Sequence, residues 1–145
     1  MKWRSLSDQE AATLPEARLG GSLLLVVAAA VSLLVVAAIG TLLWTAALRA
    51  IGLRYMIAVG LIGVWSLLFV TMTALRLRQT PLVASIGLMA WVSYRLGVVV
   101  ADDPLLHWPL LVDLLGEALM GAGFCGYMAS AVRPNAYYRR RLPTV

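Results

Sequence analysis

Charged side chains are scarce in this sequence of 145 residues. Asp, Glu, Lys and Arg together make up 13% of the chain, whereas roughly a quarter of the residues of a soluble domain are charged. Nearly all of these charges lie outside four long apolar stretches, and 61% of the residues are hydrophobic. This scarcity excludes an ordinary soluble domain and predicts that the lipid bilayer surrounds most of the chain.

Cysteine and histidine are also nearly absent. Cys125 and His107 are single representatives of their types, so the chain cannot form an intramolecular disulfide, a bis-histidine haem site or a structural zinc site. We interpret His107, with Asp102 and Asp103 beside it, as part of a solvated loop rather than a weak metal site. The sequence also groups no acid, base and nucleophile at one membrane depth. We therefore expect no metal, no cofactor and no catalytic residue.

Four apolar stretches are each long enough to cross a membrane as a helix, which takes about 20 residues. Barrel strands would appear as segments of about ten residues alternating in polarity, whereas Leu23 to Ala38 is apolar on every side except at Ser32. The sequence therefore predicts an all-α fold, a four-transmembrane-helix bundle forming a single membrane domain. Its expected parts are a lead over 1–18, spans over approximately 19–48, 55–75, 82–101 and 110–132, and a basic tail over 133–145.

Basic residues gather in the segments that an even number of spans places on one side of the membrane. The positive-inside rule assigns that side to the cytoplasm, which predicts that both termini are cytoplasmic. Arg49 and Arg54, between the first two spans, run against this rule but are outnumbered. The residues that support it are Lys2, Arg4, Arg18, Arg76, Arg78, Arg133, Arg139, Arg140 and Arg141.

The two terminal segments carry further signals. In the lead, Ser7 and Glu10 have the S-x-x-E spacing of a capping box, which is compatible with a short interfacial helix or with a frayed tail. In the tail, we expect Arg133, Arg139, Arg140 and Arg141 to contact anionic lipid, each contributing roughly 1 kcal/mol. A docking role for the tail stays open. Nucleic acid is not an expected partner, because no folded module is present to bind it.

Three ionisable residues lie inside predicted spans, where charge is costly and usually has a partner. Arg95 is about six residues deep in the third span, and Asp113 and Glu117 bracket that depth in the fourth. The two acids are four residues apart and therefore share one helical face. We predict that Arg95 pairs with one or both, as a clasp between the helices or, alternatively, as part of an ion or proton path. A further partner such as Arg49 or Arg54 stays open for the remaining acid.

Small residues give a second intramembrane signal. They let helix backbones approach closely, which is how membrane helices associate when hydrophobicity does not distinguish a partner from lipid. The contacts are expected within the bundle or with another protein. The helix-packing candidates are Gly60, Gly63, Gly116, Gly121, Gly123 and Gly126.

Three short segments resemble the YdgK-like family of small four-span bacterial inner-membrane proteins. They are Leu19-Gly20-Gly21 before the first span, the basic turn Arg76 to Pro81 before the third, and Tyr127 to Arg133 at the end of the fourth. The resemblance implies a bacterial inner-membrane location and the four-span layout. It implies no substrate, cofactor or catalytic residue, because the function of that family is unknown.

Three classes of function remain. The first is a non-enzymatic accessory or scaffold subunit that packs against another membrane protein complex or against itself, which we favour because of the glycine-rich spans. The second is an oligomeric transporter or channel for ions or small molecules that uses Arg95, Asp113 and Glu117. The third, a membrane enzyme acting on lipid or quinone, is the least favoured because no catalytic grouping is present.

Overall fold

Four long helices dominate the computed structural model, which describes residues 3–43, 52–102 and 107–144. They are α2 (Gly21–Leu43), α4 (Leu53–Ala74), α5 (Thr80–Asp102) and α6 (Trp108–Ser130). Each is long and apolar enough to cross a membrane. The predicted all-α, four-helix class is therefore confirmed. The end of the first predicted span, with Arg49 after it, lies outside the described residues.

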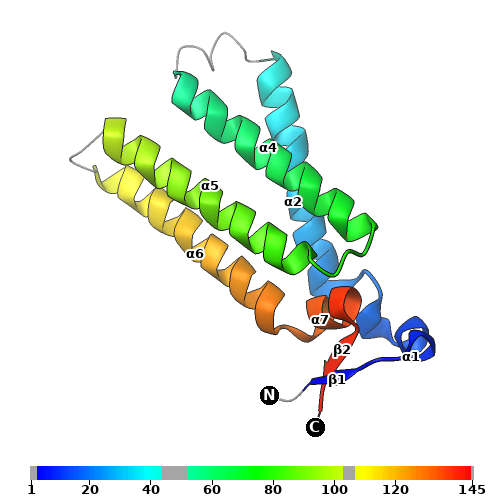
Figure 1. Cartoon of the computed structure of the whole chain (residues 1–145). Helices are drawn as coiled ribbons and strands as arrows, with labels where there is room; N and C mark the ends of the chain where they lie inside the picture. The colour runs from blue at the N-terminus through cyan, green and yellow to red at the C-terminus, as the bar shows by residue number, and fades with distance from the viewer. Residues whose placement is uncertain (1–2, 44–51, 103–106, 145) are drawn as a thin grey trace.

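Neighbouring helices pack in chain order, α2 against α4, α4 against α5 and α5 against α6. The pair α2 and α4 and the pair α5 and α6 converge beside α7 (Val132–Arg139) and diverge toward their other ends (Figure 1). We call the α7 side of the bundle the capped end and the opposite side the open end. The contacts described between α2 and α6 lie at the capped end, where the hydroxyl groups of Ser22 and Tyr127 are 2.9 Å apart.

The two terminal segments fold together into a cap over one end of the helices. The cap contains β1 (Trp3–Ser5), α1 (Asp8–Thr13), the 3-10 turn η1 (Pro15–Ala17), α7 and β2 (Arg141–Pro143). Strands β1 and β2 pair antiparallel, with Arg4 opposite Leu142. A two-stranded ribbon is marginally stable by itself, so the packing of α7 against η1 is needed to hold the cap.

Helix α1 begins with the capping box that its sequence spacing predicts. The Glu10 backbone N–H donates to Ser7 Oγ at 3.3 Å, and the Ser7 N–H donates to the Glu10 carboxylate at 2.9 Å. These bonds satisfy two donors that a helix start otherwise leaves open. The hydrogen bond from the Ser7 backbone is the main reason that the pKa of Glu10 lies below its ordinary value. In this structure the lead is a short capped helix rather than a frayed tail.

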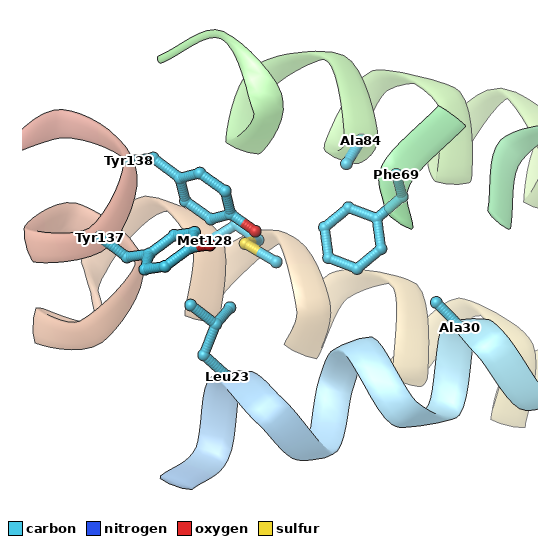
Figure 2. Packing of buried hydrophobic residues seen from close by; sticks show 7 residues of the cluster. All are labelled: Leu23, Ala30, Phe69, Ala84, Met128, Tyr137 and Tyr138. Carbon is cyan, nitrogen blue, oxygen red and sulfur yellow. The ribbon is translucent and has the colours of Figure 1, made fainter. Parts of the chain in front are cut away.

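The buried core lies at the capped end and draws side chains from five helices (Figure 2). Tyr137 and Tyr138 point from α7 into the bundle beside Met128 of α6. The Tyr137 hydroxyl donates to the Thr73 carbonyl at 3.1 Å, and the Tyr138 hydroxyl lies 2.8 Å from Thr73 Oγ1. Burial raises the pKa of Tyr138 to about 12. The core residues are Leu23, Ala30, Phe69, Ala84, Met128, Tyr137 and Tyr138.

The pair Gly20 and Gly21 at the start of α2 accommodates an arginine from the start of α7. A Cβ on Gly21 would lie 2.8 Å from Cζ of Arg133, and one on Gly20 would lie 3.6 Å from its Nη1. Gly21 also has a φ of +53°, which side chains with a Cβ disfavour. The pair therefore allows Arg133 to lie against the beginning of the first span.

Candidate functional site between the diverging helices

An ion pair between α5 and α6 is the chemically distinctive feature of the membrane-spanning helices. Arg95 donates from Nη2 and Nε to Glu117 Oε1, at 3.0 Å and 3.3 Å. The side chains are 19% and 17% exposed. At 1.5 Å per residue, Arg95 lies about 10 Å from the end of α5 at Asp102. The structure thus brings together two of the three ionisable residues that the sequence places at matching depths.

The pair is unsymmetrical at the carboxylate. Both guanidinium donors reach Oε1, while the buried Oε2 has no hydrogen-bond partner among the described residues. Such an oxygen can accept a proton or a hydrogen bond from an incoming group. A buried acceptor without a partner is costly, so a polar ligand that donates a hydrogen bond to this atom would be stabilised there.

A cavity of about 310 Å³ adjoins the pair between α4 and the α5–α6 hairpin. Tyr55 lies on one wall, with its ring 5.8 Å from the Arg95 guanidinium carbon. A cation over an aromatic face is stabilised when water is excluded. Trp91, one turn from Arg95 on α5, donates its indole N–H to the Ala58 carbonyl of α4 at 2.9 Å.

Two tryptophans join α4 and α5 in a reciprocal manner. Trp91 of α5 donates to α4, and Trp65 of α4 donates its indole N–H to the Ala84 carbonyl of α5 at 2.8 Å. In lipid an indole N–H needs such an internal partner. Gly87 is required at this contact, because a Cβ there would lie 2.8 Å from Trp65 Cδ1. Nothing in the pattern of small residues singled out Gly87, which the large facing side chain makes necessary.

Three aromatic rings pack against one another between the Arg95–Glu117 pair and the cap. Trp65 stacks on Phe69 with ring centroids 5.6 Å apart, and Phe124 of α6 meets both rings edge-on at 5.6 Å. Edge-on aromatic contacts add to the energy of simple burial. Along α4 and α6, these three rings lie between the residues that line the cavity beside Arg95 and those at the capped end.

Asp113, the third predicted ionisable residue, does not join this pair. Its side chain is exposed, and the described residues contain no ion pair to it. Arg54, considered above as an additional partner, lies 2.9 Å from Asp102 instead. Arg54 and Asp102 are 60% and 39% exposed, so this bridge contributes little stability. Arg49 and Asp103 lie outside the described residues.

The predicted packing glycines divide into two groups. A Cβ on Gly63 would meet Ala37 of α2 at 3.3 Å, and one on Gly121 would meet Met89 and Val92 of α5 at 3.4 Å. These two positions allow close helix contact inside the bundle. The other four have no neighbour within 4 Å of a built Cβ, and they are Gly60, Gly116, Gly123 and Gly126.

The basic residues of the tail are held in different ways. Arg139 donates to Asn135 at 3.2 Å, and Arg133 lies against the glycine pair as described above. Arg140 lines a cavity under the cap, and Arg141 is exposed in β2. Their contact with anionic lipid stays a prediction. Sequence reasoning did not anticipate that this tail folds back onto the bundle.

Searches against protein-family models, curated proteins and solved structures find no match to this chain. The resemblance to the YdgK-like family therefore stays a prediction. Among residues 3–43, 52–102 and 107–144, no group of three or more His, Cys, Asp or Glu side chains is arranged to hold a metal ion.

Proposed function

We propose that this protein is a non-enzymatic accessory subunit of the bacterial inner membrane that binds a transmembrane helix of a partner protein. The binding surface in this proposal is the outward face of α6, formed by Asp113, Gly116, Met120 and Gly123. The Arg95–Glu117 pair serves as an internal clasp that holds α6 against α5. The capped end faces the cytoplasm, in line with the basic residues on that side.

The observation that carries the proposal is the poor coverage of α6. In its most apolar stretch 11% of the residues are buried inside the molecule, compared with 22% in each of the other three spans. Gly116 and Gly123 leave open space where a Cβ would stand, and Met120 is 71% exposed. Small residues permit close helix approach and methionine adapts to varied partners.

The charge on this face indicates the kind of helix that fits it. Asp113 is exposed about 7.5 Å from the α6 start at Trp108, at 1.5 Å per residue, within the apolar span. A lipid-facing carboxylate at such depth is unfavourable and is stabilised by an opposite charge. A partner helix with Lys or Arg at that level supplies it. A symmetric contact between two copies of α6 instead brings two Asp113 carboxylates together, which is repulsive.

Photo-crosslinking in native membranes tests this proposal. A benzophenone amino acid at Met120 is expected to give one discrete adduct, which Asp113→Asn weakens. The matched control position is Leu25 of α2, which is 72% exposed but lies on a helix that the proposal does not use. Equal adducts from both positions, or none from Met120, would contradict the proposal. An adduct of twice the mass of the chain would assign the surface to self-association instead.

The orientation and the partner are tested separately. In a Cys125→Ser background, an impermeant maleimide applied to whole cells is expected to label His107→Cys but not Thr144→Cys. The opposite labelling would place the cap outside the cytoplasm. This experiment does not depend on whether α6 has a partner.

A second function is favoured by one specific observation, the unpartnered Oε2 of Glu117 next to the 310 Å³ cavity. An oligomeric transporter or channel would use this oxygen to accept a proton or a cation, with Arg95 and Asp113 beside it in the path. The packed rings of Trp65, Phe69 and Phe124 argue against this function, since they lie between the cavity and the capped end along α4 and α6.

Proteoliposomes containing the purified protein decide between the two functions. The transporter requires a proton or cation flux that Glu117→Gln abolishes and that is unchanged in Arg141→Gln, an exposed residue of the cap. The accessory function predicts no flux above that of empty vesicles. A flux lost only in Glu117→Gln would reverse the order of the two proposals.

A further inference from the structure

A narrow groove lies between α4 and α5, which run side by side (Figure 1). We call it the α4–α5 groove. It has a volume of about 280 Å³. Val64 and Leu68 of its α4 wall are exposed, so the groove is open to the surroundings of the bundle. All of its lining residues belong to α4 and α5, which separates it from the α6 surface of the proposed function.

Small residues of α5 make room for the groove. Ala84, Gly87 and Ala90 have no side-chain atom beyond Cβ, so space remains beside the larger residues of α4. The indole rings of Trp65 and Trp91 also line the groove, and each indole N–H donates to a carbonyl of the facing helix. An indole has no other polar group. The two rings therefore give the groove apolar surface without an open donor.

The dimensions of the groove favour a single hydrocarbon chain. Its lining on α4 extends from Leu61 to Met72, which is about 16 Å at 1.5 Å per residue. This length is about half the hydrocarbon thickness of a bilayer. A helix about 10 Å wide would need roughly four times the volume of the groove over the same length. The groove therefore fits one acyl chain of one leaflet and is too narrow to admit a partner helix.

The groove ends beside a basic turn. Met72 is two residues from the end of α4 and Val83 is three residues from the start of α5, so the connecting turn 75–79 lies at this end of the groove. The turn contains Arg76 and Arg78 and no acid, and Arg78 is exposed. Among the described residues no ion pair includes either arginine. A turn between two spans lies at headgroup depth, where basic side chains attract anionic lipid.

An apolar groove that ends at a cationic turn matches the two parts of a phospholipid. A chain that fills the groove gains dispersion contacts that an empty space forfeits. A guanidinium at the turn binds a phosphate through charge-assisted hydrogen bonds. We propose that the α4–α5 groove binds one anionic phospholipid from the leaflet at the capped end, with an acyl chain against Ala84, Gly87 and Ala90 and the phosphate at Arg78.

Lipid titration of the purified full-length chain in a neutral detergent, followed by native mass spectrometry, tests this proposal. The probes are dioleoyl phosphatidylglycerol and dioleoyl phosphatidylcholine, which share their acyl chains and differ in headgroup charge. Saturable one-to-one binding of phosphatidylglycerol is expected, at least about tenfold tighter than that of phosphatidylcholine. Equal affinity for the two lipids, or no saturable binding of phosphatidylglycerol, would overturn the proposal.

Filling the groove tests the position of the chain and leaves every charge in place. Ala90→Leu adds bulk at an exposed lining residue and is expected to abolish saturable binding. Ala29→Leu makes the same change at an exposed residue of α2, outside the groove, and should change the affinity less than about twofold. If the melting temperature without lipid shows that Ala90→Leu is misfolded, Val64→Phe fills the groove from the opposite wall. Native affinity in a folded filling variant would place the lipid elsewhere.

A charge variant tests the position of the phosphate. Arg78→Gln should weaken binding of phosphatidylglycerol by about tenfold, to the level of phosphatidylcholine. Arg141→Gln removes the same charge from an exposed residue of β2 at the same end of the bundle, and should change the affinity less than about twofold. Equal weakening by the two variants would show general attraction to the basic end and contradict the proposal.

Photo-crosslinking in native membranes identifies the occupant of the groove. A benzophenone amino acid at Val64, an exposed lining residue of α4, is expected to give an adduct of one chain with one anionic phospholipid. Ala90→Leu should remove this adduct. A discrete adduct with a second protein would instead assign the groove to a protein partner and overturn the proposal.

Discussion

The two ends of the helix bundle are held together by different interactions. At the capped end, buried side chains from five helices meet, and two tyrosine hydroxyls bind Thr73. Toward the open end, ion pairs of long side chains join neighbouring helices, Arg95 of α5 with Glu117 of α6 and Arg54 of α4 with Asp102 of α5. The first end resembles a small globular core, whereas the second is joined at separate points.

This difference follows from the surroundings of each end. The cap lies beyond the apolar spans, so burial of Tyr137 and Tyr138 is available to stabilise it. Between the spans, lipid is as apolar as a neighbouring helix, and hydrophobicity does not pull the helices together. Association of the helices there depends on close packing of their surfaces and on polar pairs between them. The open end is therefore the part of the molecule with surface left for a partner.

Removing the intramembrane clasp should have the largest effect. Arg95→Leu leaves Glu117 unpaired and partly buried, which costs up to about 3 to 5 kcal/mol, and less if water reaches it. Thermal unfolding in detergent measures the loss. Arg54→Leu, which breaks the exposed bridge, should cost less than about 1 kcal/mol. Adding Glu117→Leu to Arg95→Leu should recover part of the loss, and a double variant as unstable as the sum of its parts would show no coupling.

The contact between Trp65 and Gly87 should come next in size. Gly87→Ala introduces a Cβ at 2.8 Å from an indole that is fixed by its hydrogen bond and by stacking. A cost of about 1 to 3 kcal/mol is expected from overpacking. Gly123→Ala, with no atom within 4 Å, is the control and should be neutral or stabilise by up to about 1 kcal/mol. Equal effects in thermal unfolding would mean that α4 and α5 do not pack this closely.

The cap should be sensitive to alkaline pH. Burial raises the pKa of Tyr138 from 10.0 to about 12, so the unfolded chain loses this proton first as the pH rises. The stability that neutral Tyr138 contributes is fully present below pH 10 and is lost between pH 10 and about 12. Tyr138→Phe should remove this part of the pH dependence. Hydrogen exchange over 132–139 measures it, and identical profiles for both proteins would contradict the assignment.

The smallest effect is expected at the capping box. Ser7→Ala removes the hydrogen bond from the Glu10 backbone and should cost about 0.5 to 1 kcal/mol of local stability. Proteolysis or hydrogen exchange in 8–13 should report the loss. The α5–α6 hairpin serves as the internal reference and should be unaffected. A loss of protection that extends to α6 would show that the capped end and the open end are stabilised together rather than separately.

The helices themselves follow from local sequence properties. The ends of α4, α5 and α6 lie within two residues of the spans predicted over 55–75, 82–101 and 110–132. A backbone in lipid has to satisfy its own hydrogen bonds, so a long apolar run becomes a helix almost regardless of its neighbours. Charged and turn residues then mark where each run ends. Apolar length and the placement of charged residues are properties of a single segment, and they can be read without knowing where the other segments lie.

The choice between Asp113 and Glu117 as the partner of Arg95 shows what these single-segment properties leave open. Depth and the spacing of four residues make both acids reachable from Arg95. The rotation of α6 about its axis selects Glu117, and that rotation depends on contacts such as Gly121 against Met89 and Val92. No property of the fourth span alone contains this information.

The sequence by itself determined that the chain is a four-helix membrane protein with its charges sorted to the ends, because apolar length and charge placement act locally. Tertiary structure alone decided that the lead and the tail fold into one cap, that α6 is the least covered span, and that Arg76 and Arg140 line the same cavity. These outcomes join residues more than 60 positions apart. They depend on how whole helices rotate and cross, which no single segment of the sequence encodes.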